Sequence, residues 1–370
     1  MRDALTAVLL PTPVPRHMSY SQSTTLADCG LKYFLERVVR APYAPNMAAV
    51  GGKATHLATE WIDWFHDAAD YFESDLTRHY GAVLRWDQTE APPGSDPGGL
   101  EAKVGIRADN TRTATTIAYL DGVDTVESGE WVAKETVPGS VRDLWDIALS
   151  ESIAEESSRA AEQYQDPTTW RVFGKATKAW PNKEDRDWWD HHGPIFIMRW
   201  LHWRLTSGFK MVFLDGDPSQ PAIEVDCSGT LGGVEIKGFI DRIMLDPWGQ
   251  PSPLDIKTNS KLPDVSRQLG LYRLLLEEMG FPPPAKGYAW WARSGELGPE
   301  TDLTVPDLSE ARMVYDLRTL RDRRNNGDFQ PNTQSISCSY CGVKPFCYAR
   351  DGERSNEATR PWEVSRIEIK

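Results

Sequence analysis

The fold is decided by one stretch of the chain, residues 238–280, which reads GFIDRIMLDPWGQPSPLDIKTNSKLPDVSRQLGLYRLLLEEMG. FIDRIML and PLDIKT are short apolar runs separated by Pro, Gly and Asp, which is typical of two strands joined by a turn. Residues 264–279 follow with helical spacing of leucines, with Asp264 as a cap and Gly280 just past the end. The stretch therefore predicts a β-hairpin followed by a helix.

The same periodicities extend outward from this stretch. MVFL, AIEVDCSGTL and VEIKGFIDRIML predict further β segments from residue 209, and KGYAWWAR predicts one at 286–293. The predicted helices are 19–40, 53–80, 141–164, 185–206 (mostly after Gly193–Pro194) and 307–326. The tryptophan-rich segment 185–206 has two possible interpretations. It either covers the active site, where it would guide a single-stranded substrate, or is a buried helix, and its amphipathic aromatic pattern favours burial.

Composition limits the possible classes of protein. The 370 residues are 40% apolar, and no apolar run approaches the roughly 18 residues that a membrane span needs. The N-terminus lacks a convincing secretory signal, so we expect a cytoplasmic protein. A net charge of −13 argues against a protein that coats nucleic acid through bulk positive charge. It does not argue against an enzyme that gathers carboxylates around a metal.

Asp241, Asp255 and Lys257 form the candidate reactive centre. Residues two apart on a strand share a face, so Asp255 and Lys257 point the same way while Ile256 turns into the core. The hairpin would bring Asp241 alongside Asp255, and two converging carboxylates repel unless a cation such as Mg²⁺ lies between them. A lysine beside them can orient water or neutralise charge on a phosphate. The alternative is surface charge on exposed strand ends, which the apolar flanking residues disfavour.

With its neighbours, this arrangement resembles the PD-(D/E)XK nuclease superfamily, and within it the RecB-like exonucleases of CRISPR-associated and phage-encoded type that carry an iron–sulfur cluster. The resemblance covers residues 19–80 and 209–350, and nothing was matched in about 85–205. It implies His56 (in GxxxH), Asp241, Asp255 and the Ile256 carbonyl as metal ligands. It also implies Lys257 as the catalytic lysine, Gln268 and Tyr272 (in QxxxY) as catalytic residues that position the scissile strand, and, less specifically, Glu224. Taken singly, a histidine on an apolar helix such as His56 is more often a core residue than a ligand, and Gln268 and Tyr272 could be the polar edge of a buried helix. The joint occurrence of GxxxH, D…DxK and QxxxY in the family's order favours the nuclease.

The resemblance implies an α/β fold with a central mixed β-sheet flanked by helices, a helical insertion, and a cluster joining the two ends of the chain. The expected divisions are a helical part of the nuclease domain (1–84), an insertion (85–205), the nuclease core (206–335) and an iron–sulfur segment (336–370). The implied function is a Mg²⁺- or Mn²⁺-dependent DNA exonuclease acting on single-stranded or end-containing DNA. Its implied setting is recombination, repair or CRISPR-type processing in a bacterial or phage-infected cell, with recombination or CRISPR-adaptation proteins as partners. The alternative is a non-catalytic DNA-end-binding or assembly subunit.

Four of the five cysteines are candidate ligands of a second metal centre. Cys338, Cys341 and Cys347 have the tight spacing of metal-ligating thiolates, and Cys29 is available as a fourth ligand. Spacing alone leaves zinc, an iron–sulfur cluster or reduced structural cysteines open; the resemblance implies a 4Fe–4S cluster. Such a cluster would close a loop of some 300 residues and so stabilise the fold. Cys227 is expected to be a small buried residue.

A local basic surface is needed if the substrate is DNA. The sequence suggests an arginine-rich helix near the cysteines, with further cations close to the metal site. The residues expected to contact DNA are Arg242, Lys261, Arg318, Arg321 and Arg324, with Arg312, Arg323 and Lys237 nearby. At most one of Trp290 and Trp291 could stack on a base, because adjacent strand residues face opposite sides. The alternative for this charge run is a solvated helix face.

Overall fold

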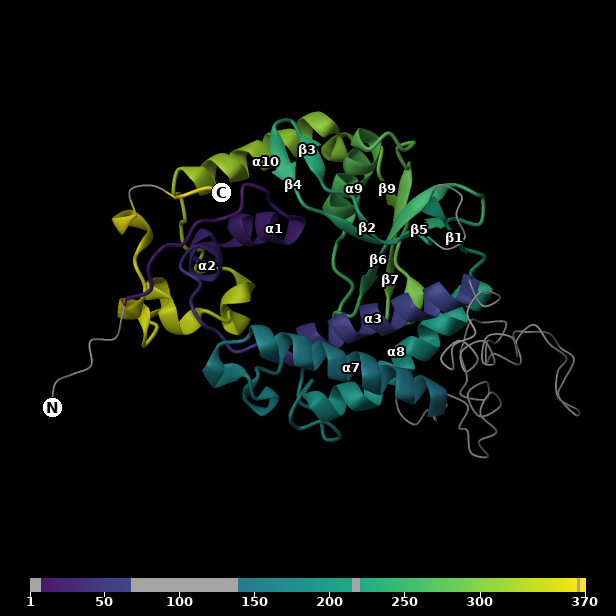
Figure 1. The fold of residues 1–370 in the computed structure, drawn as a ribbon, viewed down its shortest axis with the longest axis horizontal. Helices are drawn as coiled ribbons and strands as arrows, with labels where there is room; N and C mark the ends of the chain where they lie inside the picture. Colours follow the sequence, from purple (N-terminus) through teal and green to yellow (C-terminus); the bar gives the residue numbers. More distant parts are fainter. Residues whose placement is uncertain (1–7, 68–138, 215–219, 365–366) are drawn as a thin grey trace, which may run out of the picture.

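A mixed β-sheet forms the centre of the molecule (Figure 1). The computed structural model describes residues 8–67, 139–214, 220–364 and 367–370. Within them the seven-stranded sheet has the order β1-β5-β6-β7-β8, with β2 also pairing with β5 and β9 with β7. Its strands are β1 (Lys210–Met211), β2 (Ile223–Asp226), β5 (Phe239–Leu245), β6 (Pro251–Lys257), β7 (Lys286–Trp291), β8 (Glu296–Leu297) and β9 (Thr301–Asp302), and a separate hairpin contains β3 (Gly229–Leu231) and β4 (Val234–Ile236).

The predicted hairpin and helix are confirmed. Strands β5 and β6 pair antiparallel, and helix α9 (Ser266–Glu278) then carries the chain across to β7, which lies parallel to β6. A parallel neighbour requires such a crossover, whereas an antiparallel neighbour needs only a turn. The main-chain N–H of Ser266 donates to the Asp264 carboxylate at 2.9 Å. The expected mixed sheet flanked by helices is therefore present.

Helices cover both faces of this sheet. On one face, α3 (Met47–Asp67), α7 (Gly139–Arg159) and α8 (Arg186–Thr206) form a layer over apolar side chains of β5, β6 and β7. On the other face lies α9, and its hydrophobic core continues away from the sheet into α10 (Glu310–Asn325), α1 (Tyr20–Asp28), α2 (Gly30–Tyr33) and the π-helical turn η1 (Phe34–Val38). Successive residues of β6 point to opposite faces, so Leu254 and Ile256 are buried against the α3 layer while Asp255 and Lys257 face α9.

The tryptophan-rich segment is a buried helix, as its pattern favoured. Trp188, Trp189, Trp200 and Trp203 are all less than a tenth exposed. The helix begins earlier than expected, at Arg186, because the Asp185 carboxylate accepts from the main chain of Trp188 at 3.0 Å, and Pro194 is accommodated inside it. The predicted helix beyond residue 67 and the polar stretch 90–130 lie outside the described residues.

The two ends of the described chain pack together (Figure 1). Bridges join Leu9 to Ala358 and Val14 to Ile369. The remaining short helices are η2 (Glu162–Tyr164), η3 (Pro167–Thr169), η5 (Pro306–Leu308), η6 (Ile336–Tyr340), η7 (Lys344–Phe346), η8 (Tyr348–Arg350), η9 (Ser355–Glu357) and η10 (Pro361–Glu363). In the described part of the chain, no helix is both long and apolar enough to cross a bilayer.

Candidate active site

Three neighbouring strands bring acidic side chains to one place on the sheet. The register of β2 with β5 sets Ile223 against Arg242 and Val225 against Ile240, so Glu224 lies opposite Asp241. Continuing the register of β5 with β6 by one residue from Arg242–Leu254 places Asp241 beside Asp255. Directly opposed residues project from the same face. Glu224, Asp241 and Asp255 are therefore adjacent on one face of the sheet.

Helix α3 adds His56 to this group. The ring Nε2 lies 3.0 Å from the Ile256 carbonyl and Nδ1 lies 3.5 Å from Asp241 Oδ2. The ring nitrogen that lacks the proton has a lone pair for a cation, which can share that cation with the Ile256 carbonyl or with the Asp241 carboxylate. Ligand atoms of His56, Glu224 and Asp241 all lie within 4.8 Å of one another, which fits one hard divalent ion.

Asp255 and Lys257 form a second group directly beside the first. Lys257 Nζ lies 2.6 Å from Asp255 Oδ2 and 3.2 Å from Gln268 Oε1. Gln268 Nε2 in turn donates to Asp255 Oδ1 and to the Tyr272 hydroxyl, each at 2.8 Å. One turn of α9 separates Gln268 from Tyr272, which explains why QxxxY places both on this face. Gln268 thus fixes the orientation of both the carboxylate and the ammonium group.

That Gln268 and Tyr272 position the scissile strand stays a prediction, and the contacts that the structure shows for them are with each other and with Asp255 and Lys257. Tyr272 is only 6% exposed, and its hydroxyl is turned towards Gln268 beneath the sheet surface. Neither residue lines the cleft that opens over the metal-ligand group. Their contacts are those of positioning residues that act through Asp255 and Lys257.

The electrostatics of the site favour a bound cation. Burial, followed by the neighbouring Asp241, raises the pKa of Asp255 to about 6, although Lys257 opposes this. Glu224 opens to the cleft, yet desolvation by the cleft walls, with Asp241 nearby, raises its pKa to about 7. Carboxylates that repel one another in a partly desolvated site are stabilised in their charged form by a metal ion.

A cleft of about 1140 Å³ lies over the cluster of His56, Glu224 and Asp241. Its walls come from α3, from the loop after η3, from the segment following β6 and from the segment that carries Cys338, Cys341 and Cys347 (the cysteine segment). Cations in the walls are Lys53, Lys183, Lys257 and Arg293. The sequence did not single out Lys53, Lys183 or Arg293, although Lys53 lies inside the GxxxH motif, one turn before His56.

Arg242 is wrong as a DNA contact. Its side chain is fully buried on the α3 side of β5, where Nε lies 2.6 Å from Asp63 Oδ2 and Nη1 donates to the Asp241 carbonyl at 2.6 Å. Asp63 also accepts from Arg204 Nε at 2.8 Å. Strand alternation sends Arg242 away from the face that carries Asp241. The sequence next to the first acid thus supplies a structural ion pair that ties β5 to α3 and α8.

The arginine-rich helix α10 is used mainly for packing. Arg324 is 1% exposed and donates to the carbonyls of Pro15 and Arg16, so it is also wrong as a DNA contact. Arg318 and Arg321 donate to the carbonyls of Gly232 and Gly233 in the β3–β4 turn. None of the three lines the cleft. Their carbonyl partners explain why this helix carries so many guanidinium groups.

Other expected contacts lie closer to the cleft. Lys261 is exposed just after Asn259 and Ser260, which line it, so its contact with DNA stays a prediction. Trp290 is fully buried, while Trp291 is half-buried and its indole N–H donates to the Asn259 carbonyl at 2.8 Å. This alternation is consistent with the expectation that at most one of Trp290 and Trp291 is available to stack on a base.

The fold places the segments of Cys29 and Cys338 side by side. The Asn332 main-chain N–H donates to Cys29 Sγ, and the Cys338 thiol donates to the Asn332 carbonyl, each at 3.4 Å. Burial raises the pKa of Cys347, and the nearby Cys29 and Cys338 add to the effect. Four thiolates around one zinc ion lie about 3.8 Å apart. In the described part of the chain, the cysteines do not form a cluster that tight. Cys227 is fully buried, as expected, which raises its pKa to about 12.

The chain belongs to the PD-(D/E)XK nuclease superfamily, whose family model matches residues 145–348. That match contains Asp241, Asp255, Lys257 and the QxxxY helix. A similar protein is the Gene 69 protein of Mycobacterium phage L5, 23% identical over 253 residues that cover 59% of this chain and 85% of that protein. The match begins within α7, so the family likeness includes residues 145–205, where the motifs of the sequence showed no resemblance. Helices α7 and α8 accordingly share one core with the sheet.

Proposed function

We propose that this nuclease is a Mg²⁺- or Mn²⁺-dependent exonuclease that hydrolyses single-stranded or end-containing DNA. The observation that carries the proposal is the cluster of His56, Glu224 and Asp241 within 4.8 Å, next to Asp255 and Lys257. We assign His56, Asp241, Glu224 and the Ile256 carbonyl as ligands of the metal, with Asp255 completing the site. The resemblance implied Glu224 only less specifically, whereas here Glu224 is assigned as a metal ligand.

Each residue of this site has a separate role in the proposed hydrolysis. A divalent cation bound there would polarise the scissile phosphate and lower the pKa of the attacking water. Lys257 would orient that water and offset charge that develops on the phosphate. Gln268, held by Tyr272, would keep Lys257 and Asp255 in their productive orientation. The cleft would admit the strand from the side of the cysteine segment.

Cleavage of labelled DNA tests this function. Single- and double-stranded oligonucleotides with 5′- or 3′-blocked ends are incubated with Mg²⁺ or Mn²⁺, and with EDTA. We expect degradation that EDTA abolishes, and end blocking that identifies the polarity. Asp255→Ala and Lys257→Ala should abolish cleavage and retain a cooperative unfolding transition. DNA binding without cleavage under any of these conditions would instead support the non-catalytic DNA-end-binding subunit.

We also propose that Cys29, Cys338, Cys341 and Cys347 hold a 4Fe–4S cluster. Supporting it is the approach of Cys29 and Cys338 around Asn332. We expect a brown protein with absorbance near 400 nm and stoichiometric iron. Cys338→Ser should lose both signals, whereas Cys227→Ala, which changes a cysteine in the sheet core, should keep them. Zinc in place of iron would overturn the assignment.

Recombination, repair and CRISPR-type processing remain the proposed settings, in the cytoplasm of a bacterial or phage-infected cell. The likeness to a phage protein supports a phage-encoded role. Partners in those processes are proposed on the same basis. Measuring whether the purified protein resects duplex ends, or acts only on single strands, would separate a resection role from the trimming of a single-stranded overhang.

A further inference from the structure

Two aromatic side chains, Phe173 and Tyr340, lie in the wall of the same cleft. Their rings pack edge to face, with centroids 5.7 Å apart. Tyr340 lies between Cys338 and Cys341 and is 44% exposed, while Phe173 is half-buried in the loop after η3. The pair therefore joins the cysteine segment to a loop that is about 170 residues away in the chain.

Arg171 fixes this pair in place. Its Nε donates to the Ala44 carbonyl at 2.7 Å and its Nη1 donates to the Tyr340 carbonyl at 2.9 Å. The guanidinium carbon lies 5.4 Å from the centre of the Phe173 ring. Phe173 is thus covered by Arg171 and abuts Tyr340, which leaves the Tyr340 ring as the more exposed of the two. A rigidly held, exposed ring in a cleft is suited to stacking.

Helix α3 connects the surroundings of this pair to the metal-ligand cluster, and its length is a guide to how far apart they lie. The main chain of Arg171 pairs with Pro45 and Met47 at the start of the helix, each bond being 2.9 Å. His56 follows Met47 by nine residues, which is about 14 Å of helix at 1.5 Å per residue. At a stacked spacing of about 3.4 Å per nucleotide, this length of helix corresponds to about four nucleotides.

We propose that Tyr340, supported by Phe173, is a stacking subsite for an unpaired base within about four nucleotides of the scissile phosphate. The inference rests on the proposed DNA nuclease function and adds a residue that selects the strand. Every base offers a π-face to an aromatic ring, but only an unpaired base can turn that face out of its own stack. Lys53 and Lys183 in the walls of the cleft would contact the intervening phosphates.

The test is a scan with abasic nucleotides. Fluorescently labelled single-stranded oligonucleotides, each lacking one base at position 1 to 8 from its 5′ or its 3′ end, are titrated in Mg²⁺ into protein carrying Lys257→Ala, so that the DNA stays intact. We expect affinity to fall about tenfold at one position within the first four. In protein that also carries Tyr340→Leu, intact DNA should bind about tenfold more weakly and the dependence on position should disappear. Tyr340→Phe should restore both.

A matched control is Tyr315→Leu, which removes a tyrosine that is 65% exposed on α10 and does not line the cleft. It should leave the abasic profile unchanged, and Phe173→Leu should weaken the profile without abolishing it. A flat profile in protein that cleaves DNA would overturn the subsite and leave the nuclease proposal standing. A position-dependent profile in wild-type protein that cleaves nothing would overturn the nuclease proposal alone. Failure to bind DNA at all would overturn both.

Discussion

Neutralising Asp63 should destabilise the fold by about 3 kcal/mol. Asp63 is fully buried and accepts from Arg242 and Arg204, whose side chains are at most 2% exposed. Removing one partner of a buried ionic group costs about 3–5 kcal/mol, because the remaining charge stays buried without its counter-charge. We expect the lower end for Asp63→Asn, since each arginine also donates to a main-chain carbonyl, of Asp241 or of Phe209.

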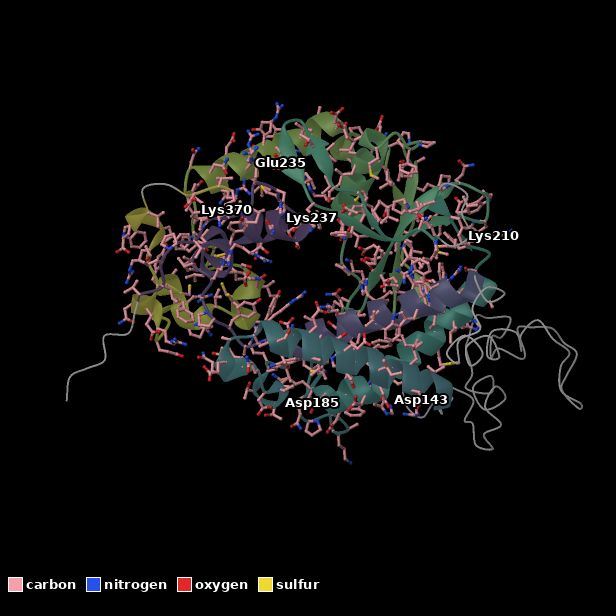
Figure 2. All side chains as sticks on the ribbon, in the orientation of Figure 1. Asp143, Asp185, Lys210, Glu235, Lys237 and Lys370 are labelled. Carbon is pink, nitrogen blue, oxygen red and sulfur yellow. The ribbon has the colours of Figure 1, made fainter. Side chains whose placement is uncertain are left out.

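Urea unfolding followed by tryptophan fluorescence measures this effect. Trp200 is a sensitive reporter because its indole N–H donates to Asp63 at 3.3 Å. The matched control is Glu235→Gln on β4, where Glu235 (labelled in Figure 2) forms an exposed ion pair with Arg16. Exposed pairs contribute about 0–1 kcal/mol, so the control should unfold almost as the wild type does. A loss of less than about 1 kcal/mol for Asp63→Asn, equal to the control, would refute the assignment of this buried network.

Three further predictions concern the site itself. Glu224→Gln should weaken Mn²⁺ binding by at least about tenfold in calorimetry of DNA-free protein, whereas Asp226→Asn, two residues along the same strand, should not; equal affinities would remove Glu224 from the ligand set. In metal-free protein the folded state holds the proton of Asp255 more tightly than the unfolded chain does, because its pKa is raised to about 6. The contribution of Asp255 to folding stability is therefore most favourable below about pH 4 and is lost as the pH rises to about 6 and above. Asp255→Asn should therefore be more stable than wild type at pH 8, by no more than about 3 kcal/mol, and equal to it near pH 3.5, so an unchanged difference across this range would contradict the burial argument. Gln268→Ala should lower kcat about tenfold to a hundredfold with little change in DNA affinity, since it releases Lys257 and Asp255; a change confined to affinity would instead indicate a direct strand contact.

The local pattern was enough to predict the elements that build the site. Alternation along β6 set Asp255 and Lys257 on one face, and the one-turn spacing of Gln268 and Tyr272 put both on one side of α9. These relations depend only on the geometry of a strand or a helix. The tryptophan-rich helix was also predictable as buried, because large aromatic surfaces are seldom left in water.

Which arginine and lysine side chains are free to contact DNA depends on interaction partners that the sequence does not show. Arg242 and Arg324 looked like DNA contacts from their position in the chain, but a guanidinium can equally satisfy a buried carboxylate or two carbonyls. Which of these it does is decided by residues some 180 or 300 positions away, Asp63 for Arg242 and Pro15 for Arg324. Lys53 and Arg293 became candidates only when the cleft placed them in its walls.

From the sequence alone it was possible to predict that Asp255 and Lys257 share a face of β6 and that Gln268 and Tyr272 share a side of α9, since their spacing follows from the periods of strand and helix. The tertiary structure then set Glu224 beside Asp241, because that contact depends on the register between β2 and β5. It likewise decided that Tyr340 of the cysteine segment meets Phe173 at the cleft, a contact made through Arg171. Long-range pairing of this kind is fixed by packing of whole layers, and no local pattern in the chain encodes it.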